Sequence, residues 1–157
     1  MKKVTLLCTA LFALPFTVQA ADNIINTAGS TGQLNTCIAA LNIADKAAML
    51  TETGPYTVFA PTDEAFTKLP KGMLADLLNP ENKEKLANIL TYHIMQGAIT
   101  TKELTTMKAP TVNGAILDIK VTNGEVMAND AHVTKADVKA SNGVIHVIDK
   151  VLLPPTR

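Results

Sequence analysis

Between residues 22 and 50, apolar residues recur at helical intervals. A short helix is predicted over residues 22–28, with Asp22 as its N-cap. Leu34, Cys37 and Leu41 then follow the spacing of an amphipathic helix with one buried face. The fold is therefore predicted to begin with helices that pack on a common core.

A longer helical run is predicted to begin at Asn79-Pro80. Asn is a favoured N-cap, and Pro suits the first position of a helix. Gly97 is predicted to end this helix. Its buried face is predicted to consist of apolar and imidazole side chains at helical spacing, namely Leu86, Ile89, Leu90, His93 and Ile94.

The last third of the chain changes to the two-residue period of strands. Leu117 and Ile119 alternate with Asp118 and Lys120, which predicts a strand with one buried and one solvated face. Residues 144–148 are more continuously apolar, as in a strand covered on both sides. The alternation slips over residues 133–138, which indicates a β-bulge. Residues 151–153 are predicted to form a final short strand before Pro154-Pro155.

Three Asn-Gly dipeptides separate these strand-like runs, at Asn113, Asn123 and Asn142. Both residues of such a pair accept a positive φ, which a tight two-residue hairpin requires. The pattern of helices followed by short strands predicts an α+β fold.

The stretch from Tyr56 to Phe66 combines both kinds of element at a corner of the predicted core. Its first residues favour a buried strand, which Pro61 is expected to end because proline cannot donate a ladder hydrogen bond. Thr62 is predicted to cap the next helix, with Asp63 in its first turn.

Three segments together resemble the fasciclin (FAS1) domain family. Residues 57–66 (TVFAPTDEAF) resemble its first signature, and residues 142–154 (NGVIHVIDKVLLP) resemble its second. Residues 90–93 (LTYH) resemble the tyrosine–histidine motif between them. We expect the two signature strands to pair as neighbours. The signature residues expected to have structural roles are Thr57, Phe59, Ala60, Pro61, Thr62, Asp63, Phe66, Asn142, Gly143, His146 and Asp149.

The resemblance implies a twisted β-sandwich or wedge with helices packed along one side. It also implies a secreted, non-catalytic module for adhesion or protein–protein contact, of the bacterial single-domain type. The expected partner is a protein or a cell-surface component, and we expect a monomer or a weak homo-oligomer. The alternative function is an extracytoplasmic carrier of a small ligand such as haem or a lipid.

The first twenty residues have the organisation of a signal peptide. Lys2 and Lys3 precede an apolar run, and residues 18–20 form a small-residue cleavage site. We expect cleavage after Ala20, export to the periplasm or beyond, and a single domain over residues 21–157. The apolar run is shorter than the ~20 residues of a membrane span. Cleavage would leave Cys37 as the one cysteine, which we interpret as a buried hydrophobe.

Charge and motif content exclude several function classes. The 14 basic and 14 acidic residues balance, and Arg157 is the one arginine, so nucleic-acid binding is not expected. The two serines, Ser30 and Ser141, lie outside any Gly-x-Ser-x-Gly elbow, and we predict no enzymatic activity. No cofactor or metal is predicted, because the three histidines lack metal-site spacing.

Tyr92 and His93 are the candidate binding residues. His93 is predicted to be buried, with its ring nitrogens bonded to nearby backbone. Tyr92 is predicted to point to an adjacent, accessible face. In adhesive members of the family the region around this motif is implicated in receptor binding, so the resemblance implies a similar role here. His146 is predicted to lie in the core and His132 at the surface.

Overall fold

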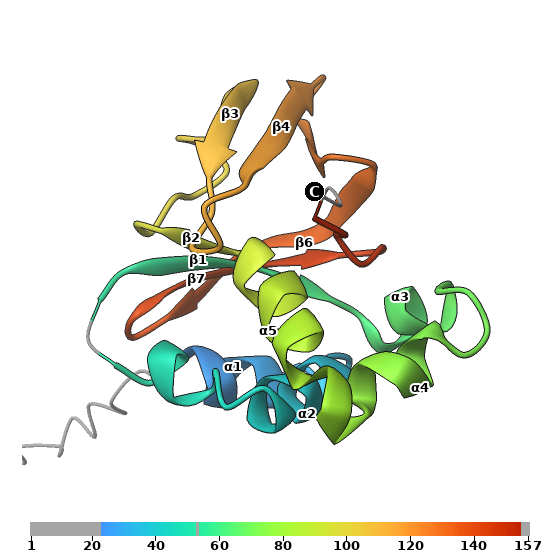
Figure 1. The fold of residues 1–157 in the computed structure, drawn as a ribbon. Coiled ribbons are helices and arrows are strands. Elements are labelled where there is room, and N and C mark those ends of the chain that lie inside the picture. The colour runs from blue at the N-terminus through green and yellow to red at the C-terminus, as the bar shows by residue number, and fades with distance from the viewer. Residues whose placement is uncertain (1–22, 53, 155–157) are drawn as a thin grey trace, which may run out of the picture.

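A computed structural model describes residues 23–52 and 54–154, and the expected signal peptide lies outside these ranges. The chain begins with helices, crosses the core once, returns to helices and ends in strands (Figure 1). In chain order the elements are α1 (Ile24–Ser30), α2 (Asn35–Ile43), η1 (Ala48–Leu50), β1 (Tyr56–Pro61), α3 (Asp63–Thr67), α4 (Met73–Leu78), η2 (Pro80–Asn82), α5 (Lys83–Tyr92), β2 (Ile94–Gln96), β3 (Met107–Pro110), β4 (Ile116–Thr122), β5 (Glu125–Ala128), β6 (Ala131–Ala140) and β7 (Gly143–Ile148).

The strands form one sheet in the order β2-β1-β7-β6-β5-β4-β3. This sheet folds over itself, so β3 and β4 stand on the side of β1 and β7 away from α1 and α2 (Figure 1). The two sheet edges meet where Met95 bridges Thr111 and the Val112 N–H donates to the Ile94 carbonyl at 2.8 Å. The expected α+β wedge, with helices along one side, is confirmed.

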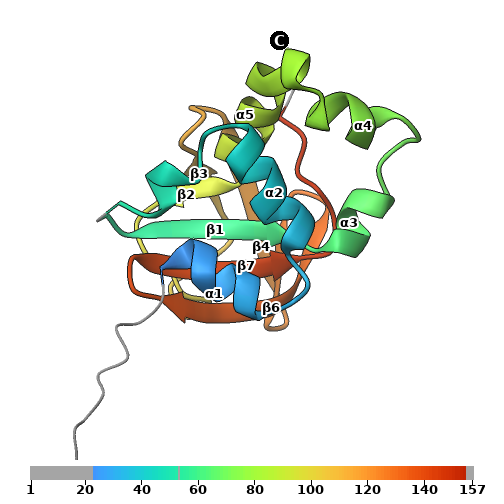
Figure 2. The same ribbon diagram turned by 90° about the horizontal axis from the view of Figure 1, so that it is seen from below.

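The folded sheet creates two hydrophobic cores, one on each face of β1 and β7. Val58 and Ala60 face the first core beneath α1 and α2, which lie across the sheet in Figure 2. Phe59 and Ile148 face the second core, which the arm formed by β3, β4 and β5 covers. Successive side chains of one strand point to opposite faces, so a strand between two cores must be apolar on both.

The two signature segments are neighbours in the sheet, as predicted. β1 and β7 run parallel with Tyr56 opposite Gly143 and Phe59 opposite His146. β1 extends through Pro61, and the Thr62 side chain then accepts the Ala65 N–H and caps α3. The predicted bulge is also present, since the pairing of β6 with β7 shifts register twice between Val133 and Val138.

Asn79 caps its run as predicted, with its side chain accepting the Glu81 N–H, but two other predicted boundaries were wrong. Asn23 rather than Asp22 caps the first helix, where its side chain accepts the Asn26 N–H. The run from Asn79 divides into a 3₁₀ turn and α5, which ends at Tyr92 rather than Gly97. Residues 94–96 leave the helix because they pair with β1 as β2, and this pairing outweighs their helical spacing.

The Asn-Gly prediction holds at one pair. Asn123 and Gly124 both have positive φ and form the two-residue turn between β4 and β5. Gly114 has a positive φ within a longer turn, whereas Gly143 is already the first residue of β7, so Ser141-Asn142 forms that hairpin loop. The predicted final strand is also wrong, because residues 151–154 pair with no strand in the described structure.

Candidate functional site

Tyr92 and His93 lie where α5 reaches the folded sheet. Tyr92 is the last residue of α5, and His93 is its C-cap. Each is only 2% exposed. The prediction that Tyr92 is accessible is therefore wrong, because the arm of β3, β4 and β5 covers its ring in the second core.

The Tyr92 hydroxyl joins that arm to the helix. It donates to the Ile116 carbonyl at 3.1 Å and accepts a hydrogen bond from the Asn129 amide at 2.9 Å. Asn129 has φ of 50°, a conformation that asparagine tolerates better than most residues. Its side-chain oxygen also accepts the Asp118 N–H at 3.1 Å. These bonds fix the first residues of β4 relative to the end of α5.

His93 joins the helix to the C-terminal segment, defined here as residues 151–154. Its Nδ1 lies 2.6 Å from the Ile89 carbonyl oxygen, and its Nε2 lies 2.9 Å from the Leu152 backbone nitrogen. A carbonyl can only accept and an N–H can only donate, so the ring is neutral with its proton on Nδ1. Burial lowers the pKa of His93 from 6.5 to about 4, and the Ile89 carbonyl partly opposes that shift.

Each of these buried residues holds backbone beside an exposed apolar side chain. Tyr92 bonds the carbonyl of Ile116, which is 58% exposed. His93 bonds the N–H of Leu152, whose neighbour Leu153 is 43% exposed. We call these two exposed side chains the Ile116/Leu153 surface. The described chain has one other large exposed hydrophobic residue, Met107 on β3.

His146 forms hydrogen bonds with two other backbone segments, at Ile99 and at Asp137. It is fully buried on β7, with its ring 5.4 Å from that of Phe59. Its Nε2 lies 2.9 Å from the Ile99 carbonyl oxygen, and its Nδ1 accepts the Asp137 N–H at 3.3 Å. Burial lowers the pKa of His146, while the Ile99 carbonyl and the Asp137 charge act in the opposite direction.

The loop of residues 97–101, which we call the strap, is fixed by side chains from three strands. The Thr57 hydroxyl on β1 donates to the Gly97 carbonyl and accepts the Ile99 N–H at 2.8 Å. The Asp137 carboxylate on β6 accepts bonds from the Thr101 N–H at 2.7 Å and hydroxyl at 2.5 Å. These bonds from Thr101 are the main reason that the pKa of Asp137 is lowered.

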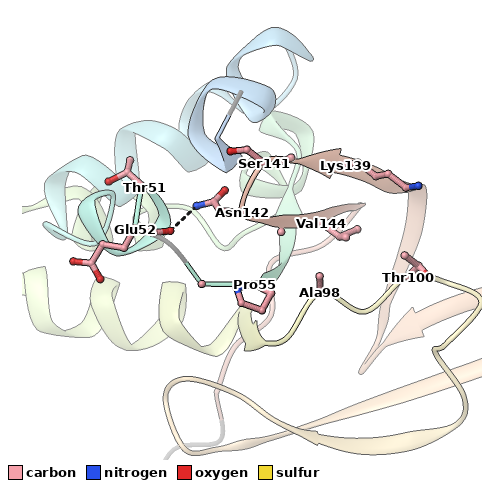
Figure 3. A pocket seen from close by; sticks show the side chains of 12 residues that line it. Thr51, Glu52, Pro55, Ala98, Thr100, Lys139, Ser141, Asn142 and Val144 are labelled. Atoms are coloured by element: carbon pink, nitrogen blue, oxygen red, sulfur yellow. Dashed lines mark hydrogen bonds between the residues drawn. The ribbon is translucent and has the colours of Figure 1, made fainter. Parts of the chain in front are cut away.

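The strap and the β6–β7 hairpin border an open depression of about 650 Å³ (Figure 3). Asn142 is one of the residues that line it, and its side chain connects three segments. Its Oδ1 accepts the Ile24 N–H at 3.0 Å, and its Nδ2 donates to the carbonyls of Leu50 and Glu52. Both polar atoms of the Asn142 side chain therefore form structural hydrogen bonds. No histidine or cysteine occurs among the described residues that line the depression.

Other signature residues also connect elements. Asp63 sits in the first turn of α3, as predicted, but its carboxylate accepts the Thr36 N–H of α2 at 2.8 Å. Asp149 accepts the His132 N–H at 2.9 Å and so holds the first residues of β6. Ala60 and Phe66 are buried in the first core. Asp63 and Asp149 thus connect elements, and Ala60 and Phe66 lie in the first core.

No metal-binding cluster occurs in the described ranges. Groups of three or more histidine, cysteine or acidic side chains that could hold a metal are absent from residues 23–52 and 54–154. His132 is exposed, whereas the ring nitrogens of His93 and His146 are bonded to backbone. Burial, with a smaller effect of Asp63, raises the pKa of Cys37 to about 12, so its thiol stays protonated. Every buried side-chain nitrogen or oxygen in these ranges has a hydrogen-bond partner.

Sequence reasoning missed Asn129 and Asp137. Both have positive φ, and both use their side chains to fix a neighbouring segment. Asn129-Asp130 forms the turn between β5 and β6, and Asn followed by Asp is a signal for such a turn. The contacts of Asp137 depend on the register shifts in β6, which the sequence does not fix.

The sequence matches the family model described as Fasciclin domain over residues 32–154. This chain belongs to the fasciclin domain family. A domain pair from the insect cell adhesion molecule Fasciclin I shares its fold, with a TM-score of 0.74 and 21% identity over 84% of this chain and 51% of that chain.

Curated relatives include bacterial and animal proteins. Protein sll1483 of Synechocystis is 47% identical over 87% of this chain and 76% of its own length. Immunogenic protein MPB70 of Mycobacterium bovis is 33% identical over 90% of this chain and 69% of its own. Transforming growth factor-beta-induced protein ig-h3 of Sus scrofa is 39% identical over 75% of this chain but only 17% of its own length. None of the described helices is long and apolar enough to cross a membrane.

Proposed function

We propose that this fasciclin domain is a non-catalytic adhesion or protein-interaction module that acts outside the cytoplasm. The solved relative comes from a cell adhesion molecule, and family membership supports a related role for this chain. The basic and apolar sequence of residues 2–18, followed by a cleavage site at Ala20, supports export to the periplasm or beyond.

The observation that carries the proposal is that two buried polar residues bond the backbone at or next to two exposed apolar residues. Tyr92 and His93 have almost no accessible surface with which to contact a partner. They instead fix the backbone at Ile116 and next to Leu153. In this role the tyrosine–histidine motif positions the Ile116/Leu153 surface, and that surface binds a protein or cell-surface component.

A pull-down from the native envelope with purified, exported protein tests this function. The double variant I116S/L153S should capture at least tenfold less partner than wild type, because both changes remove exposed apolar contacts. Its free energy of unfolding should stay within about 0.5 kcal/mol of wild type, since surface substitutions usually cost little. M107S is the matched control, because Met107 is exposed on β3 and is 36% accessible.

Native mass spectrometry and an absorbance spectrum of the same preparation test the alternative function as a carrier. If the protein is an interaction module, its native mass should equal that of the processed chain alone. A stoichiometric haem or lipid, together with equal capture of partner by wild type and I116S/L153S, would overturn the proposal.

A further inference from the structure

The C-terminal segment is attached to the body of the domain at one polar point. Residues 151–154 form no strand, and the hydrogen bond that the described structure gives them runs from the Leu152 N–H to His93 Nε2. The Leu152 side chain is buried in the second core, while Leu153 points outward. Val151 also packs against the first core. Apolar packing thus adds to the attachment, and its polar part depends on the state of one imidazole nitrogen.

The contact of Nδ1, on the other side of the ring, determines whether Nε2 donates or accepts a hydrogen bond. Nδ1 lies 2.6 Å from the Ile89 carbonyl oxygen and must carry the proton. Nε2 consequently offers a lone pair to Leu152. A second proton on Nε2 would place two N–H groups against each other, and this buried hydrogen bond would be lost.

We propose that His93 is an acid-sensitive latch, which releases residues 151–154 from α5 when its Nε2 gains a proton while the sheet and the other helices remain folded. Release frees the backbone that carries the exposed Leu153 side chain. The consequence for partner binding rests on the proposed function, but the latch itself does not.

The surroundings of His93 favour release over retention of a charged ring. Burial and the Ile89 carbonyl are the influences on its pKa, and no carboxylate compensates a buried imidazolium. Opening of the segment brings the ring to water, where its ordinary pKa of 6.5 applies. The titratable groups on α5 and on α2, α4 and η2, which pack against it, are Cys37, Asp76, Glu81, Lys83, Glu84, Lys85 and Tyr92. Those that shortly precede the C-terminal segment in the chain are His146, Asp149 and Lys150.

The linkage between proton binding and opening gives the size of the pH effect on the latch. Between pH 6.5 and about 4 the open state binds one more proton than the closed state. The equilibrium constant for opening should therefore rise about tenfold for each unit that the pH falls in this window. Above pH 6.5 it should be constant.

Amide hydrogen exchange on the full processed chain measures this opening directly. The protection factor of the Leu152 amide, corrected for the intrinsic exchange rate, should fall about tenfold per pH unit from 6.5 to 4. The Thr62 amide, which donates to the Ile148 carbonyl at 3.1 Å, reports the sheet and should keep its protection. The ¹⁵N shifts of His93 should show the Nδ1–H tautomer at pH 7 and change together with the Leu152 amide.

Two substitutions complete the test. Glutamine can still donate to Ile89 and accept from Leu152 but cannot titrate, so H93Q should abolish the pH response. H132Q changes an exposed histidine and should retain it. Constant Leu152 protection in wild type, or an equal loss at Thr62, would overturn the latch. Because the measurement uses no partner, its failure is distinct from failure of the proposed function.

Discussion

Gly143 packs directly against the backbone carbonyl of Tyr56, its partner in the parallel pairing of β1 with β7. A Cβ added at Gly143 would lie 2.0 Å from the Tyr56 oxygen. No real Cβ makes so close a contact, and the opposing atom belongs to backbone rather than to a flexible side chain. The second signature therefore requires glycine here because of close approach, and not because of a positive φ.

We predict that G143A lowers the free energy of unfolding by about 3 kcal/mol or more, because it forces apart the two central strands. Urea denaturation of both proteins measures the difference. G29A is the matched control: its Cβ would meet Ile38 Cδ1 at an ordinary 3.7 Å, on the exposed side of α1. That helical substitution should be neutral or stabilising by up to about 1 kcal/mol. Equal effects of the two changes would contradict this account of Gly143.

Asn142 gives a second prediction. N142D replaces an amide that donates to two carbonyls with a carboxylate that would repel them. We expect it to lower the free energy of unfolding by about 2–4 kcal/mol. N123D, at the exposed turn between β4 and β5, should change it by less than about 0.5 kcal/mol. Urea midpoints of the two variants at pH 7 test the contrast, and a wild-type midpoint for N142D would refute it.

The stability of the domain should depend on pH through its two buried histidines. The pKa of His93 is about 4 in the folded state against 6.5 ordinarily, and the pKa of His146 is also lowered. The unfolded chain therefore binds more protons than the folded chain between these values. The stabilisation is complete above pH 6.5 and is lost as the pH falls towards 4, by about 3 kcal/mol for His93 alone.

Urea unfolding at half-unit steps from pH 7.5 to 4 checks this slope. H132Q should leave the curve unchanged, because His132 is exposed. A free energy of unfolding that is flat from pH 6.5 to 4.5 would show that these histidines are not held neutral by the fold.

The elements that could be predicted from sequence were those whose local pattern agrees with the tertiary environment. The strand, proline and capping threonine from Tyr56 to Thr62 formed as expected, because propensity and burial point to the same structure there. The alternation in β4 likewise places Leu117 and Ile119 inside and Asp118 and Lys120 outside. The register shifts in β6 were also visible as a break in alternation.

The errors arose where distant segments decide the structure. Ile94 continues the helical spacing of α5, yet it pairs with Val58 because β1 otherwise has a free edge. The position of the Asn142 loop is set by the contact of Gly143 with Tyr56. Tyr92 was assigned to an accessible face because helical periodicity assumes one core, whereas the folded sheet provides a second.

Methyl NMR tests the central claim, that the buried Tyr92–His93 pair presents Ile116 and Leu153 to a partner. Isoleucine-, leucine- and valine-labelled protein would be titrated with native envelope fragments at pH 7.5. The account predicts that the Ile116 and Leu153 methyl signals broaden first, while those of buried Ile89 and Ile145 respond last. Perturbation centred on Val144 and the depression beside Asn142, or no perturbation at all, would contradict it.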